Sequence, residues 1–187
     1  MRGLVITIGF LTIGSAIARA QAPPLDDNEI TKRWIAIQTM AMGIDESEGT
    51  DHFASHGVSK EGAIKLVEYV RHATAEFNAW AGGYTDRVCS QAESLRAGGQ
   101  EALAQFFEKS RSTSSALRRR YVNEANVLLD EADKERLEHL FTSKEHGAKV
   151  TFIPNQPDVI ELARTGVLTV EQVLKRNKCV AIGEAQQ

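Results

Sequence analysis

Two histidines four residues apart, His52 and His56, are the side chains with the clearest metal-binding spacing in this chain. On one helix they would share a face, and Asp51 or Glu48 would add a carboxylate ligand. Glycines on both sides leave room for only a short helix, and Phe53 stands where the zinc motif H-E-x-x-H has glutamate. We therefore predict a solvated linker without a cofactor, and a divalent metal at His52 and His56 is the alternative.

Acidic side chains surround these histidines and indicate a surface for a protein partner. The residues of this predicted partner surface are Asp45, Glu46, Glu48 and Asp51. From Asp26 to Asp51 the chain carries seven acids against Lys32 and Arg33. A surface of this charge would attract a basic protein.

A second polar cluster interrupts the apolar face of a helix expected from about Gln100 to Leu129. Its residues are Ser110, Arg111, Thr113, Ser114 and Arg118. Buried hydroxyl groups cost free energy unless they find hydrogen-bond partners, so one interpretation is a polar inter-helix pocket with arginines at its rim for an anionic ligand such as a carboxylate. In the other interpretation, which we favour, these small residues let two helices approach closely and bond to their own backbone.

The motifs of common enzyme classes are missing from the sequence. It contains no G-x-S-x-G, P-loop, glycine-rich dinucleotide turn or C-x-x-C. We therefore favour a non-catalytic protein. A small-ligand-binding protein or enzyme built around Ser110 and Ser114 is the alternative.

The elements that must position these residues are helices. Apolar residues recur at steps of three and four through most of the chain after Pro24, which is typical of amphipathic helices. We expect helices to begin after the capping residues Asp26, Ser59 and Thr169. We expect them to be interrupted at the glycine pairs 82–83 and 98–99. We predict an all-α fold, an antiparallel bundle of about four to six helices. An extended connector at 147–157 and short C-terminal helices should follow.

Two cysteines, Cys89 and Cys179, are the only ones in the chain. In an oxidising compartment a single pair is typical of one disulfide. This bond would staple the C-terminal helices to the second helix. An intermolecular bridge or a free thiol pair is the alternative.

The N-terminus resembles a cleaved export signal. Arg2 precedes an uncharged, mostly apolar run from Gly3 to Ala18, and Ala18-Arg19-Ala20 matches the small-x-small pattern of signal peptidase sites. We predict a signal peptide at 1–20, a single helical domain at 21–187, and a periplasmic or secreted location. No later segment is apolar enough for stable membrane insertion.

Charge narrows the class of partner further. Loss of the two arginines in 1–20 would lower the formal net charge from −3 to −5, which disfavours nucleic acid as a ligand. The sequence therefore predicts an exported helical protein that acts on another exported or periplasmic protein. Binding, inhibitory or immunity, and chaperone-like roles all fit this description.

Overall fold

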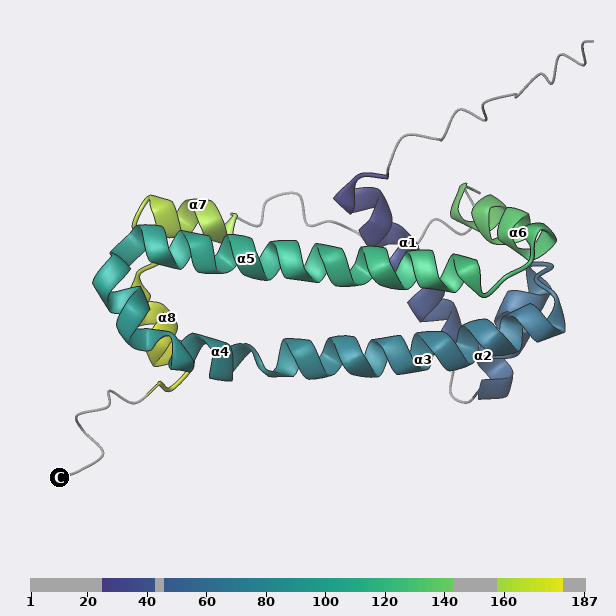
Figure 1. The fold of residues 1–187 in the computed structure, drawn as a ribbon, viewed down its shortest axis with the longest axis horizontal. Coiled ribbons are helices and arrows are strands. Elements are labelled where there is room, and N and C mark those ends of the chain that lie inside the picture. Colours follow the sequence, from purple (N-terminus) through teal and green to yellow (C-terminus); the bar gives the residue numbers. More distant parts are fainter. Residues whose placement is uncertain (1–24, 43–45, 143–157, 180–187) are drawn as a thin grey trace, which may run out of the picture.

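The structure is a computed structural model that describes residues 25–42, 46–142 and 158–179, and their regular elements are all helices (Figure 1). The helices are α1 (Asp27–Ala41), α2 (Glu46–Ser55), α3 (Lys60–Gly82), α4 (Tyr84–Ser90), α5 (Ala92–Val127), α6 (Glu131–Thr142), α7 (Val159–Arg164) and α8 (Val170–Arg176). The prediction of an all-α fold is confirmed. The expected signal peptide and the connector at 147–157 lie outside the described residues.

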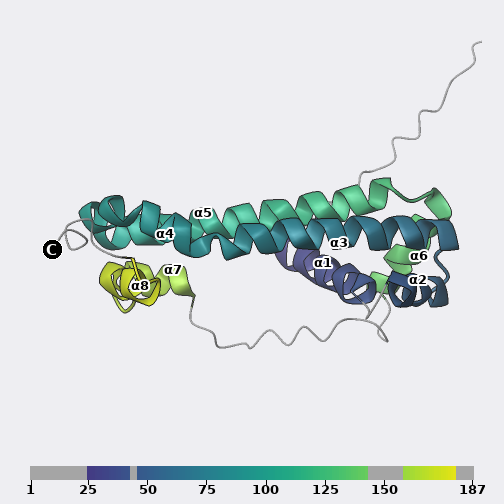
Figure 2. The ribbon, with the colours of Figure 1, turned by 90° about the horizontal axis from the view of Figure 1, so that it is seen from below.

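Two long antiparallel helices, α3 and α5, give the molecule its elongated shape (Figure 1). Seen from below, α3, α4 and α5 form one layer, and the shorter helices cover one face of it (Figure 2). Helices α1, α2 and α6 pack at one end of this face, whereas α7 and α8 pack at the other.

Local capping explains where several helices begin. The Asp26 carboxylate accepts a hydrogen bond from the Glu29 amide at 2.7 Å, and the Ser59 hydroxyl accepts one from the Gly62 amide at 3.0 Å. Thr169 forms a reciprocal capping box with Gln172. The helix starts predicted at these three caps are confirmed.

The glycine pairs interrupt the helices where the sequence predicts. Helix α3 ends at Gly82 and α4 begins at Tyr84. Gly99 has φ of 61°, a left-handed conformation that favours glycine, and α5 consists of two helical segments that meet at a kink there. The prediction that a long helix begins at about Gln100 is confirmed, because the second of these segments starts directly after Gly99.

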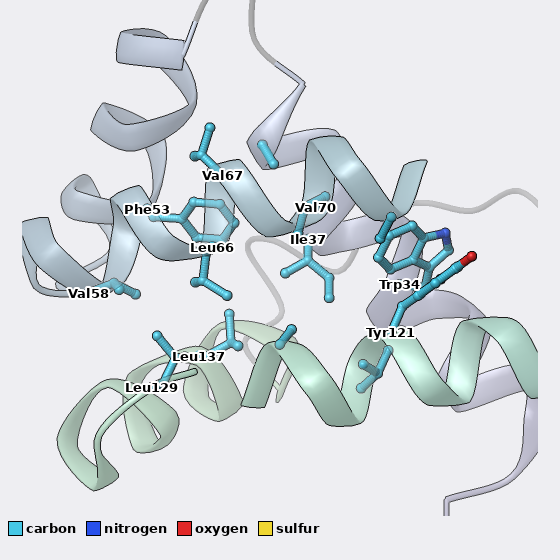
Figure 3. Packing of buried hydrophobic residues seen from close by; sticks show 14 of the residues in the cluster. Trp34, Ile37, Phe53, Val58, Leu66, Val67, Val70, Tyr121, Leu129 and Leu137 are labelled. Carbon is cyan, nitrogen blue, oxygen red and sulfur yellow. The ribbon is translucent and has the colours of Figure 1, made fainter. Parts of the chain in front are cut away.

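A first hydrophobic core joins α1, α2, α3, α6 and the C-terminal part of α5 (Figure 3). Trp34 and Tyr121 lie at one side of it with ring centroids 4.9 Å apart. The sequence-derived face of α1 is confirmed here, because Ile30, Trp34 and Ile37 are all buried. Burial of such side chains contributes about 1.5–3 kcal/mol each.

A second hydrophobic core lies at the other end of the molecule. It joins α4, the N-terminal part of α5, α7 and α8, and includes Val88, Leu103, Ile160 and Leu174. The predicted disulfide is present, and it links Cys89 of α4 to Cys179 after α8, with Cα atoms 5.1 Å apart. The short C-terminal helices are thus stapled to the long layer.

Candidate functional site

The middle of the helical layer lies between the two cores and differs from both ends in burial. None of the described residues 75–87 of α3 and α4 or 107–120 of α5 is buried. We call these two stretches the waist. An ion pair from Arg120 to Glu76 at 2.6 Å and a contact of the Arg118 guanidinium with the Phe77 ring at 5.2 Å connect them.

A small pocket opens between the two sides of the waist, and we call it the waist pocket. Its volume is about 130 Å³. Its walls are Trp80, Arg87, Gln91, Phe106, Lys109, Ser110 and Thr113. The pocket therefore combines two aromatic rings, two cationic side chains and two hydroxyl groups.

Arg87 is held in place on one wall of the waist pocket. Its Nη1 donates to the Trp80 carbonyl oxygen at 2.6 Å, and its guanidinium lies 4.9 Å from the Trp80 ring centroid. Gly83 permits this arrangement, because a Cβ there would lie 3.0 Å from Arg87 Nη1. Within the described part of the chain, neither Arg87 nor Lys109 forms an ion pair with a carboxylate.

Two members of the predicted polar cluster, Ser110 and Thr113, line this pocket. The Thr113 hydroxyl donates to the Lys109 carbonyl oxygen at 2.9 Å, so it is satisfied by its own helix. Thr113 thus bonds to its own backbone, whereas a ligand site formed by this cluster stays a prediction. The opposing residues Trp80 and Arg87 were missed, because their pairing with α5 depends on the antiparallel register.

The other members of the cluster, Ser114, Arg111 and Arg118, do not line the waist pocket. Ser114 is partly buried in the waist. Arg111 instead binds Asp158 at the start of α7, with distances of 3.1 and 2.6 Å. Burial lowers the pKa of Arg118, while the charge of Asp27 opposes this effect.

A larger groove of about 520 Å³ lies between α5, α7 and the start of α1. Three arginines line it, and each is paired with a carboxylate of the same groove. The pairs are Arg111 with Asp158, Arg119 with Asp27, and Arg164 with Glu108. Because the cations are already neutralised, this arrangement is best explained as a set of ties between helices.

The two histidines of the metal hypothesis lie on α2 and at its end, and both are turned toward backbone carbonyls. His56 Nδ1 donates to the His52 carbonyl oxygen at 2.7 Å, and His52 Nδ1 lies 3.3 Å from the Met40 carbonyl oxygen. His52 Nε2 is 4.0 Å from a Glu48 oxygen. Residues 25–42, 46–142 and 158–179 contain no group of three or more histidine, cysteine or acidic side chains that could hold a metal ion. The metal site stays a prediction.

The predicted acidic surface falls largely on α2. Asp45 lies outside the described residues, Glu46 begins the helix, and Glu48 is paired with His52. Asp51 is exposed and lines a groove of about 440 Å³ between α2 and α3, which we call the α2–α3 groove. Its remaining lining residues are Ser47, Thr50, Lys60, Ile64, Val67 and Glu68.

Ile64 is the feature of this groove that sequence reasoning missed. It is 49% exposed although it is a large apolar residue on a long helix. Its position at the flank of the buried face, three residues before Val67, could have been found from the helical periodicity of α3.

Tight packing of α2 fixes the shape of the α2–α3 groove. Gly49 is buried, and a Cβ there would lie 2.8 Å from the Ala41 carbonyl oxygen and 3.1 Å from a Val67 methyl carbon. Asp133 of α6 accepts hydrogen bonds from the Ser59 amide at 2.7 Å and the Ser59 hydroxyl at 2.5 Å. These hydrogen bonds therefore fix the turn between α2 and α3 to α6.

Comparison with known proteins adds no relative from which a role could be transferred. No family model, curated protein or solved structure matches the chain. In the described part of the chain, every helix is too short or too polar to cross a membrane.

Proposed function

We propose that this chain is an exported helical protein that binds a second exported protein through the α2–α3 groove. The observation that carries the proposal is Ile64, a half-exposed apolar side chain that lines this groove together with the acidic residues Asp51 and Glu68. The N-terminal sequence supports export, because it has the features of a signal peptide.

The chemistry of the groove indicates the class of partner. Protein interfaces commonly place an apolar anchor at the centre and charged groups at the rim, where complementary charge speeds association. Ile64 would be the anchor, and Asp51 and Glu68 would face basic side chains of the partner. Lys60, which also lines the groove, would prefer an acidic or polar contact.

A role in binding also fits the construction of this end of the molecule. Val67 lines the groove and is also a buried residue of the first hydrophobic core, so the groove is directly supported by that core. Its walls would therefore change little on association, which lowers the entropic cost of binding. Inhibitory, immunity and chaperone-like functions are all compatible with a preformed surface of this kind.

A photo-crosslinking residue at position 64 of the exported protein tests this proposal. We expect one discrete adduct with a second polypeptide, and we expect Asp51→Lys to remove most of it. Val167, an apolar residue 65% exposed at the other end of the molecule, is the matched crosslinking control. Glu93→Lys, at an exposed site on α5, is the charge control.

Two results would contradict this assignment. One is the same set of adducts from positions 64 and 167, which would indicate random collision. The other is an adduct at position 64 that Asp51→Lys leaves unchanged, because the acidic wall would then play no part in recognition.

A further inference from the structure

We infer that the waist pocket is a binding site for a small organic acid. The carboxylate would lie between Arg87 and Lys109, and the apolar part would pack against Trp80 and Phe106. This site is separate from the α2–α3 groove, so the inference goes beyond the proposed function and does not depend on it.

The charge of the lining indicates an anion. Arg87 and Lys109 contribute two positive charges, and no carboxylate lines the pocket. The large groove beside α7 provides the contrast, because every arginine there faces its own carboxylate. A carboxylate bound in the waist pocket would accept charge-assisted hydrogen bonds from Arg87 and Lys109.

The aromatic walls indicate that the anion has an apolar part. Phe106 is 7% exposed, and it contacts Tyr84 with ring centroids 5.9 Å apart. On the other wall, the ring of Trp80 packs against Phe77 at 5.5 Å. Inorganic phosphate would leave these surfaces unused, whereas a flat or short apolar group would cover them.

Size and shape restrict the ligand further. Pockets for drug-sized ligands usually have volumes of about 300–1,000 Å³. The 130 Å³ of the waist pocket therefore admits only a small acid. The Ser110 hydroxyl at the wall would supply a further hydrogen bond to the carboxylate.

The pocket is also preorganised for an anion. The Arg87 guanidinium is already oriented by the Trp80 carbonyl oxygen and the Trp80 ring. Cys89, two residues further along α4, is bonded to Cys179, and the Thr85 hydroxyl donates to the Asn177 side chain at 3.0 Å. The helix that carries Arg87 is therefore fixed to the end of α8, and little ordering is needed on binding.

Calorimetry on the oxidised mature protein tests the ligand class with three probes. Benzoate carries both required groups, benzamide lacks the charge, and inorganic phosphate lacks the apolar part. We expect benzoate to bind at least about tenfold more tightly than either of the others, with Trp80 fluorescence changing in parallel. Equal affinity for benzamide, equal affinity for phosphate, or no binding of benzoate at millimolar concentration would overturn the inference.

Matched variants test the site itself. Lys109→Gln should weaken benzoate binding about tenfold, whereas Lys175→Gln on the exposed surface of α8 should leave it unchanged. Gly83→Ala retains every charge but requires the Arg87 guanidinium to move by a few tenths of an ångström, so it should weaken binding less than Lys109→Gln does. Gly82→Ala is its control, because a Cβ there meets no atom within 4 Å. Wild-type affinity in both Lys109→Gln and Gly83→Ala would overturn the assignment.

Discussion

At the scale of single residues, Asp133 shows how one buried carboxylate organises the turn that supports the α2–α3 groove. It is 4% exposed and accepts two hydrogen bonds from Ser59, which is also the N-cap of α3. Gly62 leaves the space for it, because a Cβ at that position would lie 2.3 Å from a carboxylate oxygen of Asp133. The carboxylate thus joins α6 to the start of α3.

We predict that Asp133→Ala lowers the free energy of unfolding by about 1–3 kcal/mol, because the Ser59 donors lose their acceptor. Urea denaturation followed by circular dichroism measures this change. Glu135→Ala, at an exposed position of the same helix, should remain within about 0.5 kcal/mol of wild type. Equal stability of the two variants would show that the Asp133 contacts contribute nothing.

Residues that act on near neighbours in the chain could be predicted from the sequence, and residues that act across the fold could not. The caps Asp26, Ser59 and Thr169 follow from rules that span three residues. Asp133 bonds to Ser59 across 74 positions, so its role depends on the packing of α6 under α3. The same limit applies to Arg87, whose neighbours on α5 depend on helix register.

At the scale of elements, covalent and ionic ties hold the short C-terminal helices against the long layer. The disulfide joins α4 to the end of α8, and the Arg111–Asp158 pair joins α5 to the start of α7. The cysteine pairing could be predicted because only two cysteines are present and the N-terminal sequence predicts export. The ion pair could not be predicted, because Arg111 and Asp158 are 47 positions apart in the sequence and meet only when α7 packs on α5.

Removing the disulfide should loosen this end of the molecule selectively. We predict that the variant Cys89→Ala/Cys179→Ala loses at most about 4–5 kcal/mol of stability, the value that the chain-entropy model gives for a loop of about 90 residues. Hydrogen exchange measured by mass spectrometry should speed up in α7 and α8 before it changes in α1. Unchanged exchange in α8 would contradict a stapling role.

The Arg111–Asp158 pair should make stability depend on pH in the acidic range. The Arg111 hydrogen bonds, aided by the Ile160 amide, hold the pKa of Asp158 below its usual range. A lowered carboxyl pKa contributes stability above the unfolded-state pKa, and this contribution is lost as the pH falls through the folded-state pKa. The tie between α5 and α7 should therefore weaken at low pH.

We predict that wild type exceeds Asp158→Asn in urea midpoint above about pH 5, and that the difference shrinks toward about pH 2. Asparagine is the suitable replacement, since it caps helices nearly as well as aspartate and isolates the effect of charge. Glu93→Gln, at an exposed carboxylate without an ion pair in the described residues, is the control. A pH-independent difference for Asp158→Asn would contradict the ionic explanation.

At the scale of the whole molecule, two hydrophobic cores are joined by a waist without buried residues. Sequence periodicity predicted the helices and their apolar faces, but it did not predict that these faces divide into two clusters. The reason is physical: Ser110, Thr113 and Ser114 interrupt one face of α5, and only the fold shows that α3 and α4 are also unburied opposite them. We therefore expect that destabilising one core has little effect on the stability of the other.

We predict that Leu174→Ala, at a position 1% exposed in the second core, destabilises that end by about 2–5 kcal/mol. Exchange should speed up in α4, α7 and α8 while amides beside Trp34 keep their protection. Leu66→Ala, at a fully buried position in the first core, should give the opposite pattern. Equal acceleration at both ends in both variants would indicate one cooperative unit.

The central claim, that the chain binds another exported protein through the α2–α3 groove, is tested most directly by native mass spectrometry. The protein would be isolated gently from its own exported compartment, as wild type and as Asp51→Lys. We predict an oxidised chain lacking residues 1–20 in complex with a second polypeptide, and loss of that polypeptide from Asp51→Lys. A bare wild-type monomer, or a complex that Asp51→Lys leaves intact, would contradict the claim.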